Sequence, residues 1–180
     1  MEDYLELIID LARQQGASYA EARYQSDAYE SNLLKNGTPE ASTFEIRRGI
    51  AMRALVNGAL GFGATNILTK KDLRKLVKRV VSLAKSSSGL RKVPVQLGPA
   101  EFGQGTVEVK SRIPFGAVSA EARLDLLKEA DSAAVNAAES GNVKLPGRYL
   151  SLDALMTEKW IMNSDGARVR SLIPKVSLDA

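Results

Sequence analysis

The 180-residue chain contains no cysteine and no histidine. Without cysteine it can form no disulfide framework and carry no thiol chemistry, which fits a reducing compartment. Without histidine it lacks the usual general base, the usual activator of a nucleophile and the commonest metal ligand. We therefore expect no catalytic residue, no metal site and no cofactor in this chain.

Long hydrophobic runs are absent as well. The longest, such as residues 5–12, are interrupted by charge and fall well short of the roughly 20 residues of a membrane-spanning helix. Met1 is followed by acidic residues rather than by a basic stretch and an apolar run, so we expect no secretory signal. These features predict a cytoplasmic protein with no membrane partner.

Apolar residues are nevertheless plentiful. They make up 44% of the chain, enough to bury the core of one large domain or of two small lobes. Serine, glycine and proline punctuate residues 86–105, which predicts a linker. We expect residues 1–85 to form a helix, an antiparallel sheet and a basic helix, and residues 106–180 to form a second α+β lobe.

The most informative stretch covers residues 49–66, GIAMRALVNGALGFGATN. Its first half alternates with the two-residue period of a strand that has one apolar face. Asn57 and Gly58 then predict a type I′ hairpin turn, because both residues tolerate positive φ. A return strand is expected over residues 59–65.

Two glycines shape that return strand. Gly61 and Gly63 lie two positions apart and project from one face, leaving a bare strip that another backbone or a ligand could approach. We expect Phe62 to point inward. Together with Gly58 these glycines match neither a dinucleotide fingerprint nor a phosphate-binding loop, so turn and bulge geometry is the favoured interpretation.

The rest of the chain predicts an α+β fold, with an antiparallel meander of about four strands and helices packed on one face of the sheet. Asn36 and Gly37 predict a second hairpin, and Arg47, Arg48 and Gly49 a corner. Helices are expected over residues 3–15, 69–86 and 119–139, with an Asp3–Glu6 capping box, Thr69 and Ser119 as N-caps, Gly16 as a left-handed terminator, and Leu124, Leu127, Ala134 and Ala138 inward. Further strands are expected near residues 107–109, 150–162 and 169–173, with a turn over residues 163–166.

Few side chains suggest chemistry. Arg53 could face a ligand carboxylate or pair with Glu45. Asp153 and Glu158 are too isolated to form an acid/base pair, and Trp160 with Met162 fits a core better than a cofactor site.

Positive charge is concentrated in residues 69–92, which carry nine basic residues and one acid in a chain of net charge +4. A patch of this kind could bind nucleic acid or another acidic partner. The alternative is a solvated helix face whose charges neighbour acids elsewhere in the fold. We favour this alternative because the segment has no interleaved aromatic residues that could stack on bases.

Residues 49–66 resemble the amino-terminal domain of the TldD/PmbA family. The resemblance rests on Gly49, Arg53, Asn57, Gly58, Gly61, Phe62, Gly63 and Asn66. It extends upstream through residues 19–23 and downstream along the helix with Leu73, Val77, Val81, Ala84 and Lys85. Beyond about residue 88 the similarity is weaker.

The resemblance implies a scaffold, dimerisation and peptide-channel role in a zinc metallopeptidase of the modulator of DNA gyrase family. Active members of that family hold zinc with a His-Glu-x-x-x-His helix and a later cysteine, none of which is present here. Zinc is therefore expected only in a further carboxy-terminal domain, and only in the active paralogue. Expected partners are a second copy or a family paralogue, and unfolded peptide; the alternative is a self-contained basic module that binds nucleic acid.

The final residues also favour a longer protein. Val176 and Leu178 still alternate with polar neighbours, so the sequence stops inside a strand pattern. A terminal strand docked into the sheet is the alternative. We expect the catalytic-type domain to follow Ala180.

Overall fold

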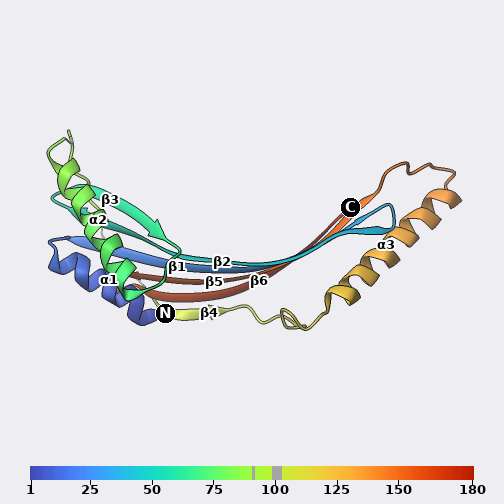
Figure 1. Ribbon diagram of the computed structural model, residues 1–180, viewed down its shortest axis with the longest axis horizontal. Helices are drawn as coiled ribbons and strands as arrows, with labels where there is room; N and C mark the ends of the chain where they lie inside the picture. The colour runs from blue at the N-terminus through green and yellow to red at the C-terminus, as the bar shows by residue number, and fades with distance from the viewer. Residues whose placement is uncertain (91, 99–102) are drawn as a thin grey trace. The chain divides into compact units, whose positions relative to one another are not determined.

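The computed structural model describes residues 1–90, 92–98 and 103–180. Three helices and six strands follow one another along the chain (Figure 1). In order they are α1 (Glu2–Gln14), β1 (Tyr19–Lys35), β2 (Thr38–Val56), β3 (Ala59–Thr65), α2 (Lys70–Ser88), β4 (Gln104–Glu108), α3 (Ala120–Ser140), β5 (Tyr149–Asn163) and β6 (Arg168–Asp179). The strands form one sheet in the order β3-β2-β1-β5-β6-β4, which confirms the predicted α+β class.

The sheet is mostly antiparallel. Short turns join β1 to β2, β2 to β3 and β5 to β6, and β2 pairs antiparallel with β3 from Ile50↔Thr65 to Val56↔Ala59. The exception is β4, which runs parallel to β6 in the register Gln104↔Arg168 to Glu108↔Leu172. That parallel strand was not expected from the sequence.

The chain forms two compact units that are each built from separate segments. Unit 1 comprises Met1–Ser26, Arg48–Glu108 and Glu158–Leu172, and unit 2 comprises Asp27–Arg47, Val109–Thr157 and Ile173–Ala180. The long strands β1, β2, β5 and β6 contribute to both units. A boundary within residues 86–105 stays a prediction, and five residues of that stretch, Arg91 and residues 99–102, lie outside the described residues.

Unit 1 is held together by α1 and α2, which cover one face of its sheet (Figure 1). Its buried cluster follows the predicted periodicities of the two helices and of the strands. Small residues on β1 let the helices approach closely. The cluster includes Leu5, Ile8, Ile9 and Ala12 of α1, Ala20 and Ala22 of β1, Ile50, Met52, Ala54 and Val56 of β2, and Leu73, Leu76, Val77, Val80, Val81 and Ala84 of α2.

The glycines of β3 are the points of closest approach to α2. A Cβ atom built on Gly61 would lie 2.2 Å from the carbonyl oxygen of Val80, and one on Gly63 would lie 2.8 Å from Val80 Cγ2. The bare strip predicted from the sequence is therefore filled by a helix. Phe62, which alternates with the two glycines, points away from α2 and is 67% exposed, so the expectation that it faces inward is wrong.

Both predicted Asn-Gly hairpins are confirmed. Asn36 and Gly37 have φ of 49° and 79°, and Asn57 and Gly58 have φ of 48° and 76°. The corner expected at Arg47, Arg48 and Gly49 does not form, because β2 continues without interruption through these residues, and residues 18–65 contain three strands rather than four. Gly49 has a packing reason instead: a Cβ there would lie 3.0 Å from the Thr65 carbonyl oxygen.

Two of the three described helices begin with a side-chain N-cap. Thr69 Oγ1 accepts from the Asp72 amide, and Ser119 Oγ accepts from the Ala122 amide, both at 3.1 Å. The capping box expected in α1 is wrong: Met1 is the N-cap and makes no side-chain cap, because the helix begins at Glu2 and Asp3 already lies in its first turn. Gly16 has φ of +96°, as predicted.

Unit 2 packs α3 against its part of the sheet. Leu127 contacts Leu34 and Leu150 in a small buried cluster. The other buried positions of α3 are Arg123, which pairs with Glu30, and Asp131, which pairs with Arg148. The inward placement predicted for Ala134 is wrong, because the buried face of α3 recurs every four residues through positions 123, 127 and 131.

Candidate functional site

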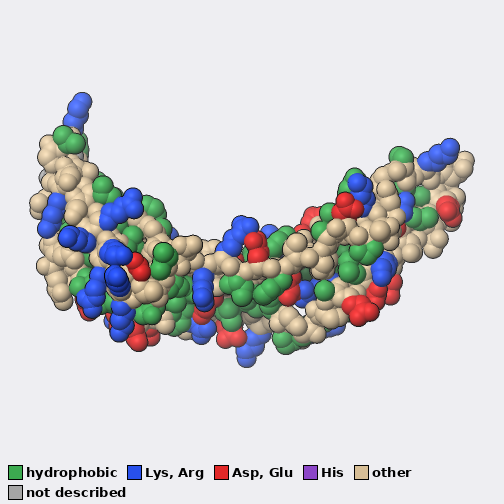
Figure 2. Space-filling model, in the orientation of Figure 1, with side chains coloured by type: hydrophobic (Ala, Val, Ile, Leu, Met, Phe, Trp, Pro, Cys, Tyr) green, Lys and Arg blue, Asp and Glu red, His purple; other side chains and the backbone are tan. Residues whose placement is uncertain are grey.

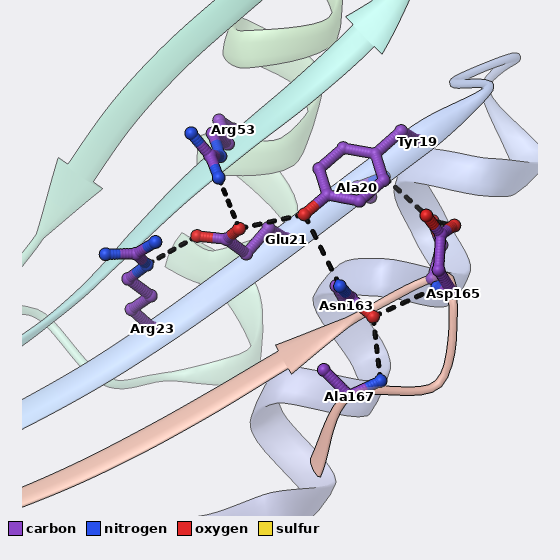
Figure 3. Close-up of polar contacts among 9 residues, drawn as sticks. Tyr19, Ala20, Glu21, Arg23, Arg53, Asn163, Asp165 and Ala167 are labelled. Carbon is purple, nitrogen blue, oxygen red and sulfur yellow. Dashed lines mark hydrogen bonds and ion pairs between the residues drawn. The ribbon is translucent and has the colours of Figure 1, made fainter. Parts of the chain in front are cut away.

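A buried carboxylate lies on the face of the unit 1 sheet that α1 and α2 leave open. Strand alternation turns Ala20 and Ala22 toward the helices, so that Glu21 and Arg23 project from the opposite face. Glu21 is buried there between two guanidinium groups (Figure 3). Its Oε2 accepts from Arg53 Nη2 at 2.6 Å and its Oε1 accepts from Arg23 Nε.

A tyrosine completes this cluster. The Tyr19 hydroxyl donates to Glu21 Oε2 at 2.8 Å, and Asn163 Nδ2 lies 3.5 Å from the same hydroxyl (Figure 3). Asn163 is fixed in turn by the β5–β6 hairpin, because its Oδ1 accepts from the amides of Asp165 and Ala167 at 3.0 and 2.8 Å. The turn predicted at residues 163–166 thus positions a polar side chain beside the cluster.

Burial and hydrogen bonding act in opposite directions on Glu21. Burial would raise the pKa of its carboxyl, but the hydrogen bonds from Arg23, Arg53 and Tyr19 outweigh burial and hold the pKa below its ordinary value. Burial raises the pKa of Tyr19, and the neighbouring Glu21 raises it further. At neutral pH the cluster therefore contains one carboxylate, one neutral phenol and two guanidinium groups.

Two cavities share Glu21, Arg23 and Arg53 as lining residues. The first, of about 190 Å³, also includes Phe62 and Ala51. The second, of about 310 Å³, also includes Tyr19, Asn163 and the segment at Leu97 and Gly98. Arg53 and Arg23 are 42% and 55% exposed. At the first cavity these two guanidinium groups leave one positive charge in excess of the buried carboxylate, whereas at the second cavity Asp165 supplies a second carboxylate that balances it.

The residues singled out from the sequence divide into two groups, those that line the cavities and those that support the β2–β3 hairpin. Arg53 and Phe62 line the cavities, so the structure brings these two together. Gly61 and Gly63 lie beneath α2, Asn57 and Gly58 form the turn, and Gly49 and Asn66 lie at the far end of the β2–β3 hairpin; these residues support the hairpin rather than the cavities. Arg53 pairs with Glu21, so the suggested pairing with Glu45 is wrong; Glu45 pairs with Arg47.

Tyr19, Glu21 and Asn163 were missed as site residues. The available signal was the alternation on β1, which placed Glu21 and Arg23 on the face opposite the alanines. Two of the residues discussed from the sequence have structural partners instead: Tyr29 donates to Asp153 at 2.8 Å, and Glu158 pairs with Arg170 at 2.8 Å. Met162 is buried in the unit 1 core, as expected.

The exposed face of α2 carries the predicted positive charge. Figure 2 shows lysine and arginine side chains gathered over this helix. Lys75 pairs with Asp72 at 2.9 Å. Within the part of the chain that the structure describes, six further cations of α2 form no ion pair: Lys70, Lys71, Arg74, Lys78, Arg79 and Lys85. Neutralisation by acids from elsewhere in the fold, which the sequence left open, is therefore not observed for these six.

The described residues offer no metal site. Across residues 1–90, 92–98 and 103–180, no three acidic side chains come together so that they could hold an ion. In the same residues no helix combines the length and the apolar character needed to span a bilayer.

Two family models match the chain: the PmbA/TldA metallopeptidase domain 1 over residues 20–84, and the PmbA/TldA metallopeptidase central domain over residues 113–180. The chain belongs to the PmbA/TldD metallopeptidase family. This agrees with the resemblance drawn from residues 49–66 and extends it beyond residue 88.

Individual relatives agree with this assignment. The chain is 24% identical over 173 residues to a protein of Haemophilus influenzae named metalloprotease TldD homolog, covering 95% of this chain and 34% of the relative. Its fold matches a candidate modulator of DNA gyrase from Bacteroides thetaiotaomicron with a TM-score of 0.76 at 16% identity, covering 98% of this chain and 39% of that one. It also matches TldE from Thermococcus kodakarensis with a TM-score of 0.70 at 12% identity, covering 97% and 38%. The chain thus spans about a third of the length of the curated relative.

Proposed function

We propose that this chain is the scaffold and peptide-channel wall of a PmbA/TldD-type peptidase, and that the cavities around Glu21 and Arg53 contact the peptide. The observation that carries the proposal is the excess guanidinium charge at the first of these cavities, the one that Phe62 also lines. A guanidinium group binds a carboxylate through paired hydrogen bonds, and the neighbouring Phe62 supplies an exposed aromatic surface. An unfolded peptide offers both a carboxylate and apolar side chains.

Zinc chemistry is not assigned to these residues. The chain has no histidine or cysteine, and its described carboxylates form no cluster of three, so the residues present do not fit a catalytic zinc ion. Any zinc that serves a peptidase of this family is proposed to bind outside this chain. What the chain's own residues contribute is binding and orientation of the peptide.

Peptide binding should depend on the terminal carboxylate of the peptide and on Arg53 together. An unstructured peptide with a free carboxyl terminus is expected to bind about tenfold more tightly than its amidated form, the effect of losing one charge-assisted hydrogen-bonded contact. In Arg53→Gln the two peptides should bind equally. Fluorescence anisotropy with labelled peptides measures all four affinities.

The matched control is Arg74→Gln, which removes an exposed arginine from α2. This variant should retain the tenfold preference for the free carboxylate. Circular dichroism establishes that each variant is folded, and the comparison of two peptides on one variant cancels any general loss of stability. A preference that survives in Arg53→Gln, or no preference in the parent chain, would contradict the proposal.

We also propose that the protein works as a dimer with a second copy or with a family paralogue, in the cytoplasm. The support is the family assignment together with the exposed apolar side chains Phe44 and Ile46 on β2. Apolar side chains on an exposed strand are a common feature of surfaces that pair with another chain.

A second candidate function is binding of nucleic acid through α2. The favouring observation is the row of cations on its exposed face, of which, among the described residues, Lys75 alone forms an ion pair. They recur in adjacent pairs every four residues, Lys70 with Lys71, Arg74 with Lys75 and Lys78 with Arg79, so successive pairs lie about 6 Å apart along the helix. That spacing is comparable with the separation of successive phosphates, and the contacts would read no base sequence.

Salt dependence tests this candidate. If four or more phosphates are contacted, the logarithm of the affinity for a short DNA duplex should fall with the logarithm of salt concentration with a slope of about −4. Replacing Lys78 and Arg79 by glutamine should reduce the slope by about 2, whereas Lys128→Gln on α3 should leave it unchanged. A slope near zero in the parent chain would exclude the nucleic-acid function.

A further inference from the structure

The outer edge of β2 is open over most of its length. The neighbour of β2 on that side is β3, which pairs only with residues 50–56 of β2. On that side, no strand among the described residues lies beside β2 from Thr38 to Gly49, whereas β1 lies on its other side. The main-chain amide and carbonyl groups along this edge point outward, which is the arrangement that pairs with another strand.

The side chains on this segment also favour pairing. Phe44 and Ile46 are 61% and 57% exposed, although aromatic and β-branched residues are typical of strands that pack against neighbours. Pro39, which cannot donate a ladder hydrogen bond, lies at the start of the strand and leaves residues 40–49 able to pair. The segment is therefore long, apolar in part and unblocked.

The charges along this open edge of β2 indicate that its partner is a second copy of the same segment. Glu40 and Glu45 precede Arg47 and Arg48, so the segment is acidic in its first part and basic in its last part. An antiparallel copy of the same segment brings opposite charges together, whereas a parallel copy would bring like charges together. Such a self-complementary surface is what a two-fold dimer interface requires.

We propose that a second copy of this chain pairs antiparallel with residues 43–49 of β2, so that the sheets of two protomers join edge to edge. With Ile46 opposite the partner's Ile46, Glu45 lies opposite the partner's Arg47 and Phe44 opposite the partner's Arg48. Within one chain Glu45 already pairs with Arg47 at 2.7 Å, so the two ion pairs of the separate protomers are exchanged for two pairs across the interface. The inference rests on the dimer of the proposed function but is independent of peptide binding.

Charge reversal followed by mixing tests the interface. In Glu45→Arg the new arginine lies opposite the partner's Arg47, and in Arg47→Glu the new carboxylate lies opposite the partner's Glu45. Each variant alone should therefore dimerise at least about tenfold more weakly than the parent chain. An equimolar mixture of the two variants restores opposite charges at both positions and should recover the parent affinity. Analytical ultracentrifugation over a wide concentration range measures all the constants.

Two controls sharpen the result. Glu129→Arg makes the same change in net charge on the exposed face of α3 and should leave the dimer unchanged. Because the chain has no cysteine, Ile46→Cys introduces a single thiol at the two-fold axis, and mild oxidation should link two copies, whereas Lys128→Cys should not link them.

The outcomes separate the interface from the dimer itself. Weakened variants that recover on mixing, with Ile46→Cys cross-linked, support the proposed pairing. A dimer that both reversals leave unchanged, or weakened variants that do not recover on mixing, overturns this interface while the dimer stands. A parent chain that is monomeric at every concentration overturns both the interface and the homodimer.

Discussion

Replacing Gly61 by alanine is expected to lower the free energy of unfolding by about 3 kcal/mol, the upper part of the range for forcing extra atoms into a packed core. The added Cβ would lie 2.2 Å from the Val80 carbonyl oxygen and 3.1 Å from the Ala84 amide nitrogen. Both atoms belong to the backbone of α2, so no side-chain rotation relieves the contact. The helix would have to move away from the sheet and open the unit 1 core.

Urea denaturation followed by circular dichroism measures this effect, and two other glycines calibrate it. Alanine at Gly63 meets only the ends of side chains, Val80 Cγ2 at 2.8 Å and Leu76 Cδ1 at 3.0 Å, so a smaller loss of about 1 kcal/mol is expected. At Gly105 the added Cβ has no atom within 4 Å, and little change is expected. Equal stability of Gly61→Ala and Gly105→Ala would show that α2 does not approach β3 as closely as described.

The second large effect is expected at Glu21. Glu21→Gln should lower the free energy of unfolding by about 2 kcal/mol, less than the loss of a fully buried ion pair because Arg23 and Arg53 are partly exposed. The substitution keeps the shape of the side chain but leaves two guanidinium groups beside each other without a carboxylate. Asp125→Asn, which removes the exposed partner of Lys128, is the matched control and should change stability little.

The pH dependence of stability checks the same cluster. The pKa of Glu21 is lower in the folded protein than the ordinary value of 4.5 for a glutamate side chain, so its carboxylate stabilises the fold above that value. This contribution is lost as the pH falls below 4.5 and through the folded pKa. The parent chain should therefore lose more stability than Glu21→Gln between neutral and acidic pH, and parallel pH profiles would contradict the assigned role.

Much of unit 1 could be predicted because its local signals agree with its packing. The apolar period of α2, its Thr69 cap and the Asn57–Gly58 turn each specify one structure. The glycine pair on β3 predicted that another element approaches this strand closely, but the sequence did not identify that element. Its identity depends on tertiary packing: only the folded chain shows that α2 fills the strip and that Phe62 consequently faces the open side.

The Glu21 cluster could not be found in the same way. Counting back residue by residue from the Asn36–Gly37 turn places Glu21 opposite Met52, whose side chain faces the helices. In the structure Glu21 shares the open face with Arg53, so the pairing of β1 with β2 is offset by one residue along its length. Such an offset moves a side chain to the other face, and no turn signal in the sequence encodes it.

The uninterrupted course of β2 through residues 47–49 was also not predicted from the sequence. Arg47, Arg48 and Gly49 form a basic and glycine-containing cluster, which is typical of a corner. The arginines are instead exposed on a continuous strand, and the glycine allows the end of β3 to approach. The local composition therefore marked Gly49 correctly as a position with a special packing requirement, but the corner that it predicted there does not form.

The central claim is that this chain supplies a peptide-binding scaffold and no zinc chemistry of its own. Metal analysis of the purified chain after dialysis, combined with a peptide-cleavage assay with and without a chelator, tests it most directly. With no histidine or cysteine, only carboxylates could act as charged ligands, and these suit Mg²⁺ or Ca²⁺ better than Zn²⁺. We expect no stoichiometric zinc and no chelator-sensitive cleavage; about one zinc per chain, or cleavage that the chelator abolishes, would contradict the account.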